Sequence, residues 1–205
     1  MKVNEMAVSD AYIVRPRQFL DDRGLFLEWY RHDAVTEAVG HPLRLAQANH
    51  SVSRRGCVRG LHYADVPPGQ AKYVTCVRGA VLDVVVDLRV GSPGFGQSDS
   101  IRLDDREHAA VYIAEGLGHA FVALTDDATV IYLCSSVYDP AAEHGLNPLD
   151  PDLGLPWPGD LPLLLSDKDA AAPSLAAAIA AGRLPDYRQC RAYYANLSTP
   201  GRPAE

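Results

Sequence analysis

The 205-residue sequence lacks any apolar run long enough to form a membrane-spanning helix, which needs about 18 or more consecutive apolar residues. A secretory signal peptide also needs an uninterrupted apolar core. Glu5 and Asp10 interrupt the N-terminal segment where that core would lie. We therefore expect a cytoplasmic protein with no membrane partner.

Positive charge is scarce as well. The chain has 19 Lys and Arg against 26 Asp and Glu, which gives a formal net charge of -7. An acidic protein lacks the broad electrostatic attraction that draws basic proteins to nucleic acids and anionic lipids. We therefore expect no nucleic-acid partner, although a local cationic pocket remains compatible with this balance.

Cysteine is limited to Cys57, Cys76, Cys134 and Cys190, which are far apart and show no C-x-x-C spacing. Three of them lie in predicted strands, where free cysteines behave as small buried apolar side chains. Nucleotide-binding motifs are also missing, because "GSPGFG" at 91–96 does not lead into a helix and no Walker-type lysine is present. We expect no disulfide, no zinc site and no redox cofactor.

Short β-rich runs make up residues 46–138, among them "QANHSVS", "AVLDVVVDLRV" and "TVIYLCSS". Turn residues such as Pro67-Pro68-Gly69 and Gly91-Ser92-Pro93-Gly94 separate these runs, and no helical period lies between them. This pattern favours a sandwich or barrel over alternating β and α units. We predict an all-β protein with the form of a jelly-roll barrel.

Helices are predicted only on the flanks of this region. "HDAVTEAVG" has Asp33 as an expected N-cap and Gly40 as its end, and Ser174 is the expected N-cap of the Ala-rich segment that Gly182 ends. The Pro- and Gly-rich C-terminus has little to bury. We predict one domain over residues 1–190 and a flexible tail over 191–205.

Residues 58–79, "VRGLHYADVPPGQAKYVTCVRG", place Arg59, His62 and Lys72 inside two predicted strands. Polar side chains in half-buried strands need partners or a cavity that uses them. In a regular strand Arg59 and His62 point to opposite faces. Because a glycine inside a strand often marks a bulge, a shared cavity for these two residues requires an irregularity near Gly60.

Each of these residues taken alone is more often structural than functional, because most buried polar groups are simply paired. Arg59, His62 and Lys72 nevertheless lie within fourteen residues, so their burial costs add unless they share anionic partners. Tyr132 lies on the more polar face of its strand, where a core aromatic with a bonded hydroxyl is the structural alternative. The "SDKD" loop at 166–169 is either a solvated, capping charge cluster or part of the same site.

A metal site is the main alternative chemistry for a β-barrel that carries histidines. Such barrels commonly present two histidines as H-x-H, followed by a carboxylate and a third histidine. Position 60 is Gly, so only His119 from a later strand could join His62. Two nitrogens without an evident carboxylate make a weak site, and we expect no metal.

Several segments resemble the dTDP-4-dehydrorhamnose 3,5-epimerase family of the cupin superfamily. These segments cover most of the chain with the spacing of that family: "DDRGLFLEW" at 21–29, "QANHSVSRRGCVRGLHY" at 47–63, "GQAKYVTCVRGAVLDVVVDLRVGSPGFGQ" at 69–97, "EGLGHAFVAL" at 115–124, "TVIYLCSSVYDPAAEHG" at 129–145 and "LSDKDAAAP" at 165–173. The resemblance implies a cupin-type jelly-roll homodimer that needs no cofactor. It also implies an enzyme that epimerises a dTDP-4-keto-6-deoxyhexose at C3, C5 or both.

By matching position, the resemblance implies four catalytic roles. His62 would be the general base and Asp169 its carboxylate partner, Tyr132 would be the acid, and Lys72 would face the developing enolate. The residue types suit the reaction. A proton next to a ketone leaves only when a base takes it and a cation stabilises the resulting negative charge.

The resemblance also implies a set of substrate-binding residues. It assigns Arg23 and Arg59 to the diphosphate and Tyr138 to the nucleobase, with the segment around Arg23 and Phe26 reaching the site of the partner subunit. The remaining implied pocket residues are Phe19, Phe26, Glu28, Gln47, Asn49, His119, Glu143 and Lys168. A metal-dependent cupin oxygenase or isomerase and a non-catalytic sugar-nucleotide-binding barrel are the alternatives.

Overall fold

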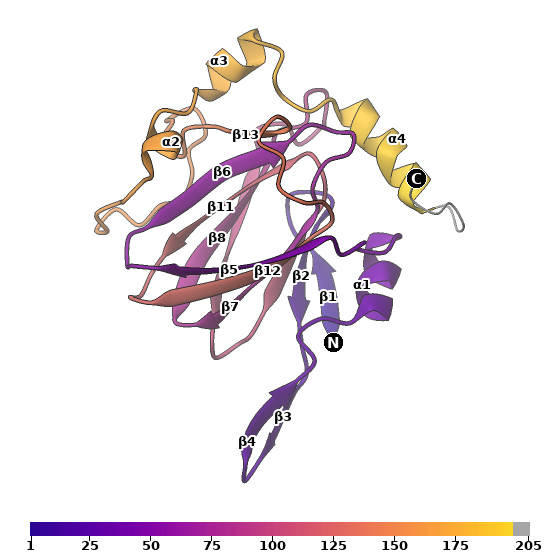
Figure 1. The fold of residues 1–205 in the computed structure, drawn as a ribbon, viewed down its shortest axis with the longest axis vertical. Helices are drawn as coiled ribbons and strands as arrows, with labels where there is room; N and C mark the ends of the chain where they lie inside the picture. The colour runs from indigo at the N-terminus through magenta and orange to yellow at the C-terminus, as the bar shows by residue number, and fades with distance from the viewer. Residues whose placement is uncertain (199–205) are drawn as a thin grey trace.

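The computed structural model describes residues 1–198, and two antiparallel sheets form its centre (Figure 1). The first sheet has the strand order β1 (Lys2–Glu5), β2 (Ala11–Arg15), β10 (Ala110–Ile113), β7 (Lys72–Arg78), β12 (Ala128–Cys134) and β5 (Gln47–Ser53). The second has the order β13 (Glu143–Gly145), β6 (Val58–Ala64), β11 (Leu117–Ala123), β8 (Ala80–Asp87) and β9 (Ser98–Asp104).

The two sheets pack against each other through a common apolar core. Val74 and Val130 of the first sheet belong to the same buried cluster as Val81, Val85 and Phe121 of the second. The other face of the second sheet is also covered, because a second cluster joins its strands to Leu146, Leu153 and Leu175 of the C-terminal segment. The predicted all-β jelly roll is confirmed, with neighbouring strands drawn from distant parts of the chain.

Within the described residues, four short helices flank the sheets: α1 (His32–Val39), α2 (Asp167–Ala170), α3 (Leu175–Ala180) and α4 (Tyr187–Leu197). Ser174 is the N-cap of α3, as predicted, and its hydroxyl accepts a hydrogen bond from the backbone N–H of Ala177. The predicted N-cap of α1 is wrong, because α1 begins earlier and Asp33 pairs with Arg31 instead of capping the helix. No helix of residues 1–198 is long and apolar enough to cross a membrane.

The predicted flexible tail does not begin at residue 191. Residues 191–197 continue α4, and both Cys190 and Tyr194 are buried on the side of the helix that faces the sheets. The Tyr194 hydroxyl donates a hydrogen bond to the backbone carbonyl of Glu115. Cys190 and Tyr194 are at the i, i+4 spacing, so both lie on one face of the helix. Burial of this face stabilises α4 although most of its other residues are polar. The predicted tail residues 199–205 lie outside the described part of the chain.

A two-stranded hairpin, β3 (Gln18–Asp21) and β4 (Gly24–Leu27), projects away from both sheets (Figure 1). We call residues 18–27 the arm. Large apolar side chains of the arm are exposed, with Phe19 at 42%, Leu20 at 78% and Phe26 at 66%. Isolated two-stranded hairpins are only marginally stable in water. Exposed apolar surface of this kind is typical of a site that packs against another protein surface.

Candidate active site

A cavity of about 290 Å³ opens between the strands of both sheets. Its walls come from β6, β7, β11 and β12, and the turn at the start of α2 closes one side. The lining residues are Cys57, Val58, Arg59, His62, Lys72, His119, Phe121, Tyr132, Ser166, Lys168 and Asp169. The structure therefore brings together all four predicted catalytic residues, which come from β6, β7, β12 and α2.

A bulge in β6 turns Arg59 and His62 toward the same cavity. His62 pairs with His119 and Arg59 pairs with Phe121, so three steps along β6 match two steps along β11. The extra residue reverses the side-chain alternation of the strand. Gly60 lies within the bulge at φ +116°, and a Cβ atom there would lie 2.5 Å from the carbonyl oxygen of His119. The irregularity expected near Gly60 is confirmed.

His62 and Asp169 form a histidine–carboxylate pair across 107 residues of sequence. His62 Nε2 and Asp169 Oδ1 are 2.7 Å apart. The short helix α2 holds the carboxylate, because its N-cap Ser166 accepts a hydrogen bond from the backbone N–H of Asp169. With Nε2 donating to Asp169, the free nitrogen that can take a proton is Nδ1.

Asp169 is buried, yet its surroundings favour the ionised form. Burial alone would raise the pKa of this carboxyl group. The hydrogen bond and the charge of His62, together with hydrogen bonds from Ser166 and the Gly60 backbone, outweigh burial and leave the pKa below its ordinary value. The carboxylate can therefore orient His62 and stabilise the imidazolium that forms when the ring takes a proton.

Lys72 presents an ammonium group to the same cavity. Burial lowers the pKa of this ammonium below its ordinary value, while the nearby Cys134, Glu143 and Asp83 act in the opposite direction. A cation held in a partly desolvated cavity interacts strongly with any negative charge that develops nearby. Lys72 is therefore suited to stabilise an enolate oxygen.

Tyr132 reaches the cavity from β12, on the first sheet, whereas His62 reaches it from the second. Burial raises the pKa of the Tyr132 phenol, with Cys134 and Glu143 adding to the effect and Arg59 opposing it. The phenol is therefore protonated at neutral pH and can act as a proton donor. Placement on opposite sheets suits two groups that act on opposite faces of one carbon.

Other cavity residues are held by contacts to the protein. Arg59 donates through Nε to the Ser53 hydroxyl at 3.0 Å and through Nη2 to the Val52 carbonyl at 3.4 Å. His119 Nε2 lies 2.8 Å from Asp83 Oδ2. Among residues 1–198, no three His, Cys, Asp or Glu side chains gather in a way that could hold a metal ion.

Four further predicted binding residues do not line this cavity. The Gln47 amide donates to Asn49 Oδ1 at 2.8 Å and accepts from the backbone N–H of Tyr138 at 2.9 Å, while Glu143 accepts from Gln70 at 3.2 Å. The contacts of Gln47 join the start of β5 to the segment that follows β12. The Tyr138 side chain is exposed. Their predicted contacts with substrate stay predictions.

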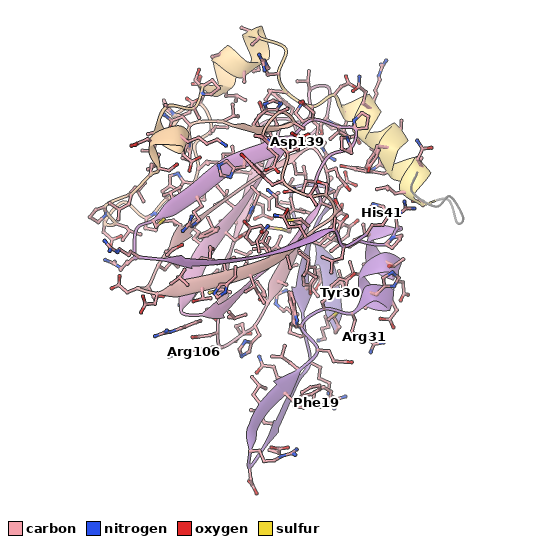
Figure 2. All side chains as sticks on the ribbon, viewed as in Figure 1. Phe19, Tyr30, Arg31, His41, Arg106 and Asp139 are labelled. Atoms are coloured by element: carbon pink, nitrogen blue, oxygen red, sulfur yellow. The ribbon has the colours of Figure 1, made fainter. Side chains whose placement is uncertain are left out.

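The arm and the residue that follows it carry four more predicted residues that do not line the cavity of the same chain. Arg23 pairs with Asp21, the rings of Phe19 and Phe26 are 6.2 Å apart, and Glu28 lies 3.7 Å from Arg31. Figure 2 shows Phe19 on the arm, away from the body of the sheets. Their predicted action in a partner subunit stays a prediction.

The sequence analysis missed several residues at the cavity. Phe121 shares a strand face with His119, so strand alternation alone was enough to find it. Cys57, Val58 and Ser166 carried no such signal. Their position depends on a bridge between Cys57 and Leu164, which joins segments more than 100 residues apart.

Comparison with known proteins gives a consistent result. A family model described as dTDP-4-dehydrorhamnose 3,5-epimerase matches residues 5–177. A dTDP-4-dehydrorhamnose 3-epimerase from Streptomyces niveus is 55% identical, over 98% of this chain and 97% of the relative. A dTDP-4-dehydrorhamnose 3,5-epimerase from Mycolicibacterium smegmatis is 54% identical, over 96% of this chain and 97% of the relative.

Solved structures agree with these sequence matches. A 3'-monoepimerase from Streptomyces bikiniensis, crystallised in complex with dTDP-quinovose, superposes with a TM-score of 0.92 at 49% identity. The match covers 95% of this chain and 98% of that one.

Proposed function

Since this chain belongs to the dTDP-4-dehydrorhamnose 3,5-epimerase family and is a sugar-nucleotide epimerase, we propose that its cavity epimerises a dTDP-4-keto-6-deoxyhexose. The reacting carbon lies next to the 4-ketone, at C3, C5 or both. The His62–Asp169 pair carries this proposal, because it places an oriented base in a cavity that also holds Lys72 and Tyr132. No cofactor takes part in the proposed reaction.

The proposed mechanism has two proton transfers. His62 Nδ1 removes the proton from the carbon, and the electron pair of the C–H bond moves toward the ketone to give an enolate. The Lys72 ammonium stabilises the enolate oxygen. Tyr132 then delivers a proton to the opposite face of the carbon, which inverts its configuration. Asp169 stays ionised throughout and holds the His62 ring.

The cavity also suits the nucleotide part of the proposed substrate. Arg59 and Lys168 line it, so a chain with net charge -7 carries a local cationic region. Guanidinium and ammonium groups bind phosphate oxygens well. The structure of the Streptomyces bikiniensis relative with dTDP-quinovose supports a sugar nucleotide as the ligand.

The proposed enzyme is a homodimer in which each arm completes the site of the partner subunit. The exposed aromatic and aliphatic side chains of the arm support this assembly, because such surface is typical of interfaces. Arg23 would then meet the diphosphate of the substrate in the neighbouring site. We place the enzyme in the cytoplasm, where its four free thiols match a reducing compartment.

Solvent exchange tests the proposed function. In deuterated water, wild-type protein incubated with dTDP-4-keto-6-deoxyglucose should incorporate deuterium at sugar C3, C5 or both, and NMR locates the label. A general base contributes about 10²- to 10⁴-fold to such a rate. His62→Ala should therefore reduce exchange by about that factor, whereas Tyr132→Phe should retain some exchange and fail to complete the inversion.

His144→Ala is the matched control for His62→Ala. His144 also pairs with a carboxylate, at 2.9 Å from Asp65, but it does not line the cavity. The exchange rate of the His144→Ala variant should equal that of wild type. Wild-type exchange in His62→Ala would reject the base assignment, and a wild-type protein that binds the nucleotide without any exchange would favour a non-catalytic binding barrel.

A further inference from the structure

Asp83 is a fully buried carboxylate beside the candidate site, and the proposed mechanism gives it no role. It lies on β8 opposite Phe121, two residues along β11 from His119. Side chains two residues apart on a strand share a face, as do directly opposite residues of neighbouring strands. Asp83, His119 and Phe121 therefore point to the same face of the second sheet. Its Oδ2 atom is 2.8 Å from His119 Nε2.

The contacts of Asp83 are incomplete. Its Oδ1 atom is buried and has no hydrogen-bond partner among the described residues. A buried carboxylate with an unpaired oxygen costs free energy unless a nearby positive charge compensates it. Such groups in native proteins call for a specific explanation.

Lys72 carries a positive charge that interacts with Asp83 through space. Three acidic or thiol groups act on the Lys72 ammonium: Cys134 of β12, Glu143 of β13 and Asp83 of β8. Of the three, Asp83 is the one that contacts a cavity histidine, and its side chain is fully buried. The carboxylate therefore acts on two cavity side chains, by direct contact with His119 on the second sheet and by its charge on Lys72 on the first.

We propose that Asp83 is a positioning residue of the epimerase: it supports the charge of Lys72 and fixes the ring of His119, so that both meet the sugar around its ketone. This role rests on the proposed function. Asp83 touches no substrate and transfers no proton. Because Nε2 of His119 is held by Asp83, Nδ1 is the ring nitrogen left to accept a hydrogen bond from a sugar hydroxyl.

The test is the pH profile of kcat in Asp83→Asn. The substitution keeps the shape of the side chain and removes its charge. Without that negative charge the Lys72 ammonium loses its proton at lower pH, so the basic limb of the profile should move to lower pH. At neutral pH kcat should fall on the order of 10- to 100-fold, with little change in KM.

Two further variants separate positioning from folding. Asp83→Glu restores the charge and should return the basic limb to its wild-type position, with kcat still reduced because the His119 contact is displaced. His119→Asn keeps the Asp83 charge, so kcat should fall while the basic limb stays in place. If Asp83→Asn does not fold, a wild-type kcat in His119→Asn still overturns the proposal.

Asp65→Asn is the matched control. It removes the same charge from another histidine–carboxylate pair, outside the cavity, and should leave the pH profile unchanged. Folded Asp83→Asn with a wild-type profile would overturn the role of Asp83 alone. Absence of solvent exchange in the wild-type protein would instead overturn the proposed function, and this role with it.

Discussion

Gly60 is a single residue that decides which side chains share the candidate site. Its φ of +116° is a conformation that residues with a Cβ atom rarely adopt. A Cβ atom would also lie 2.5 Å from the His119 carbonyl oxygen and 2.7 Å from the Cα of Ala120. Backbone conformation and space both require glycine here, and the bulge that follows brings Arg59 and His62 to one cavity.

Gly60→Ala should therefore lower both stability and activity. Backbone strain and overpacking together should reduce the free energy of unfolding by about 2–5 kcal/mol, as measured by urea denaturation. The folded fraction should also lose kcat, because straightening β6 turns Arg59 or His62 away from the cavity. Gly91→Ala is the control, since Gly91 has a φ of +87° but open space around it. That change should cost only about 1–2 kcal/mol, and kcat should not change.

At the scale of elements, α4 is an integral part of the fold, although the sequence predicted a flexible tail from residue 191 onward. Tyr194 is 7% exposed, and its hydroxyl bonds to the Glu115 carbonyl and lies 3.4 Å from the Arg89 guanidinium. Arg89 in turn binds Asp87 and Asp10. The helix is thus anchored through its aromatic side chain to the turn between β10 and β11.

Tyr194→Ala should cost about 3–5 kcal/mol of unfolding free energy, since it removes a buried aromatic ring and its hydrogen bonds. Asn196→Ala, at an exposed position of the same helix, should stay within about 0.5 kcal/mol of wild type. Both are measured by urea denaturation of the full chain. Equal stability of the two variants would mean that α4 contributes no anchoring.

At the scale of the whole molecule, the arm decides between two arrangements of the site: one formed within a single chain and one completed by a partner subunit. The Arg23 side chain is 91% exposed, and the arm that carries it projects away from both sheets (Figure 1). If it binds substrate in a partner subunit, Arg23→Ala should raise KM roughly 10- to 100-fold, the value of a charge-assisted hydrogen bond. In that case each site uses residues of two chains, and full activity requires the dimer.

Coexpression of His62→Ala and Arg23→Ala chains checks this assembly. A mixed dimer has one site with an intact His62 that receives an intact arm from its partner, so the mixture should regain wild-type KM at part of its sites. A chain that carries both substitutions is the control. Its homodimer has no intact site and should show no recovery of activity. Mixed dimers without recovery would show that each arm serves its own chain or no site.

The sequence by itself predicted the class of the fold, and its resemblance to a known family named the candidate catalytic residues. Turn residues at short intervals and the absence of a helical period are local signals, and they predicted an all-β jelly roll. His62, Lys72, Tyr132 and Asp169 were all named before the fold was known, and all four line one cavity. The glycine inside β6 even indicated where the strand had to be irregular.

Only the tertiary structure decided what depends on long-range proximity. No local pattern indicates that Asp83 lies 2.8 Å from His119, that Cys57 pairs with Leu164, or that Tyr194 reaches Glu115. These contacts arise when the two sheets and α4 pack, and their partners are dozens of residues apart. Residue type and spacing encode local conformation and chemistry, whereas packing of distant segments determines which of those residues meet.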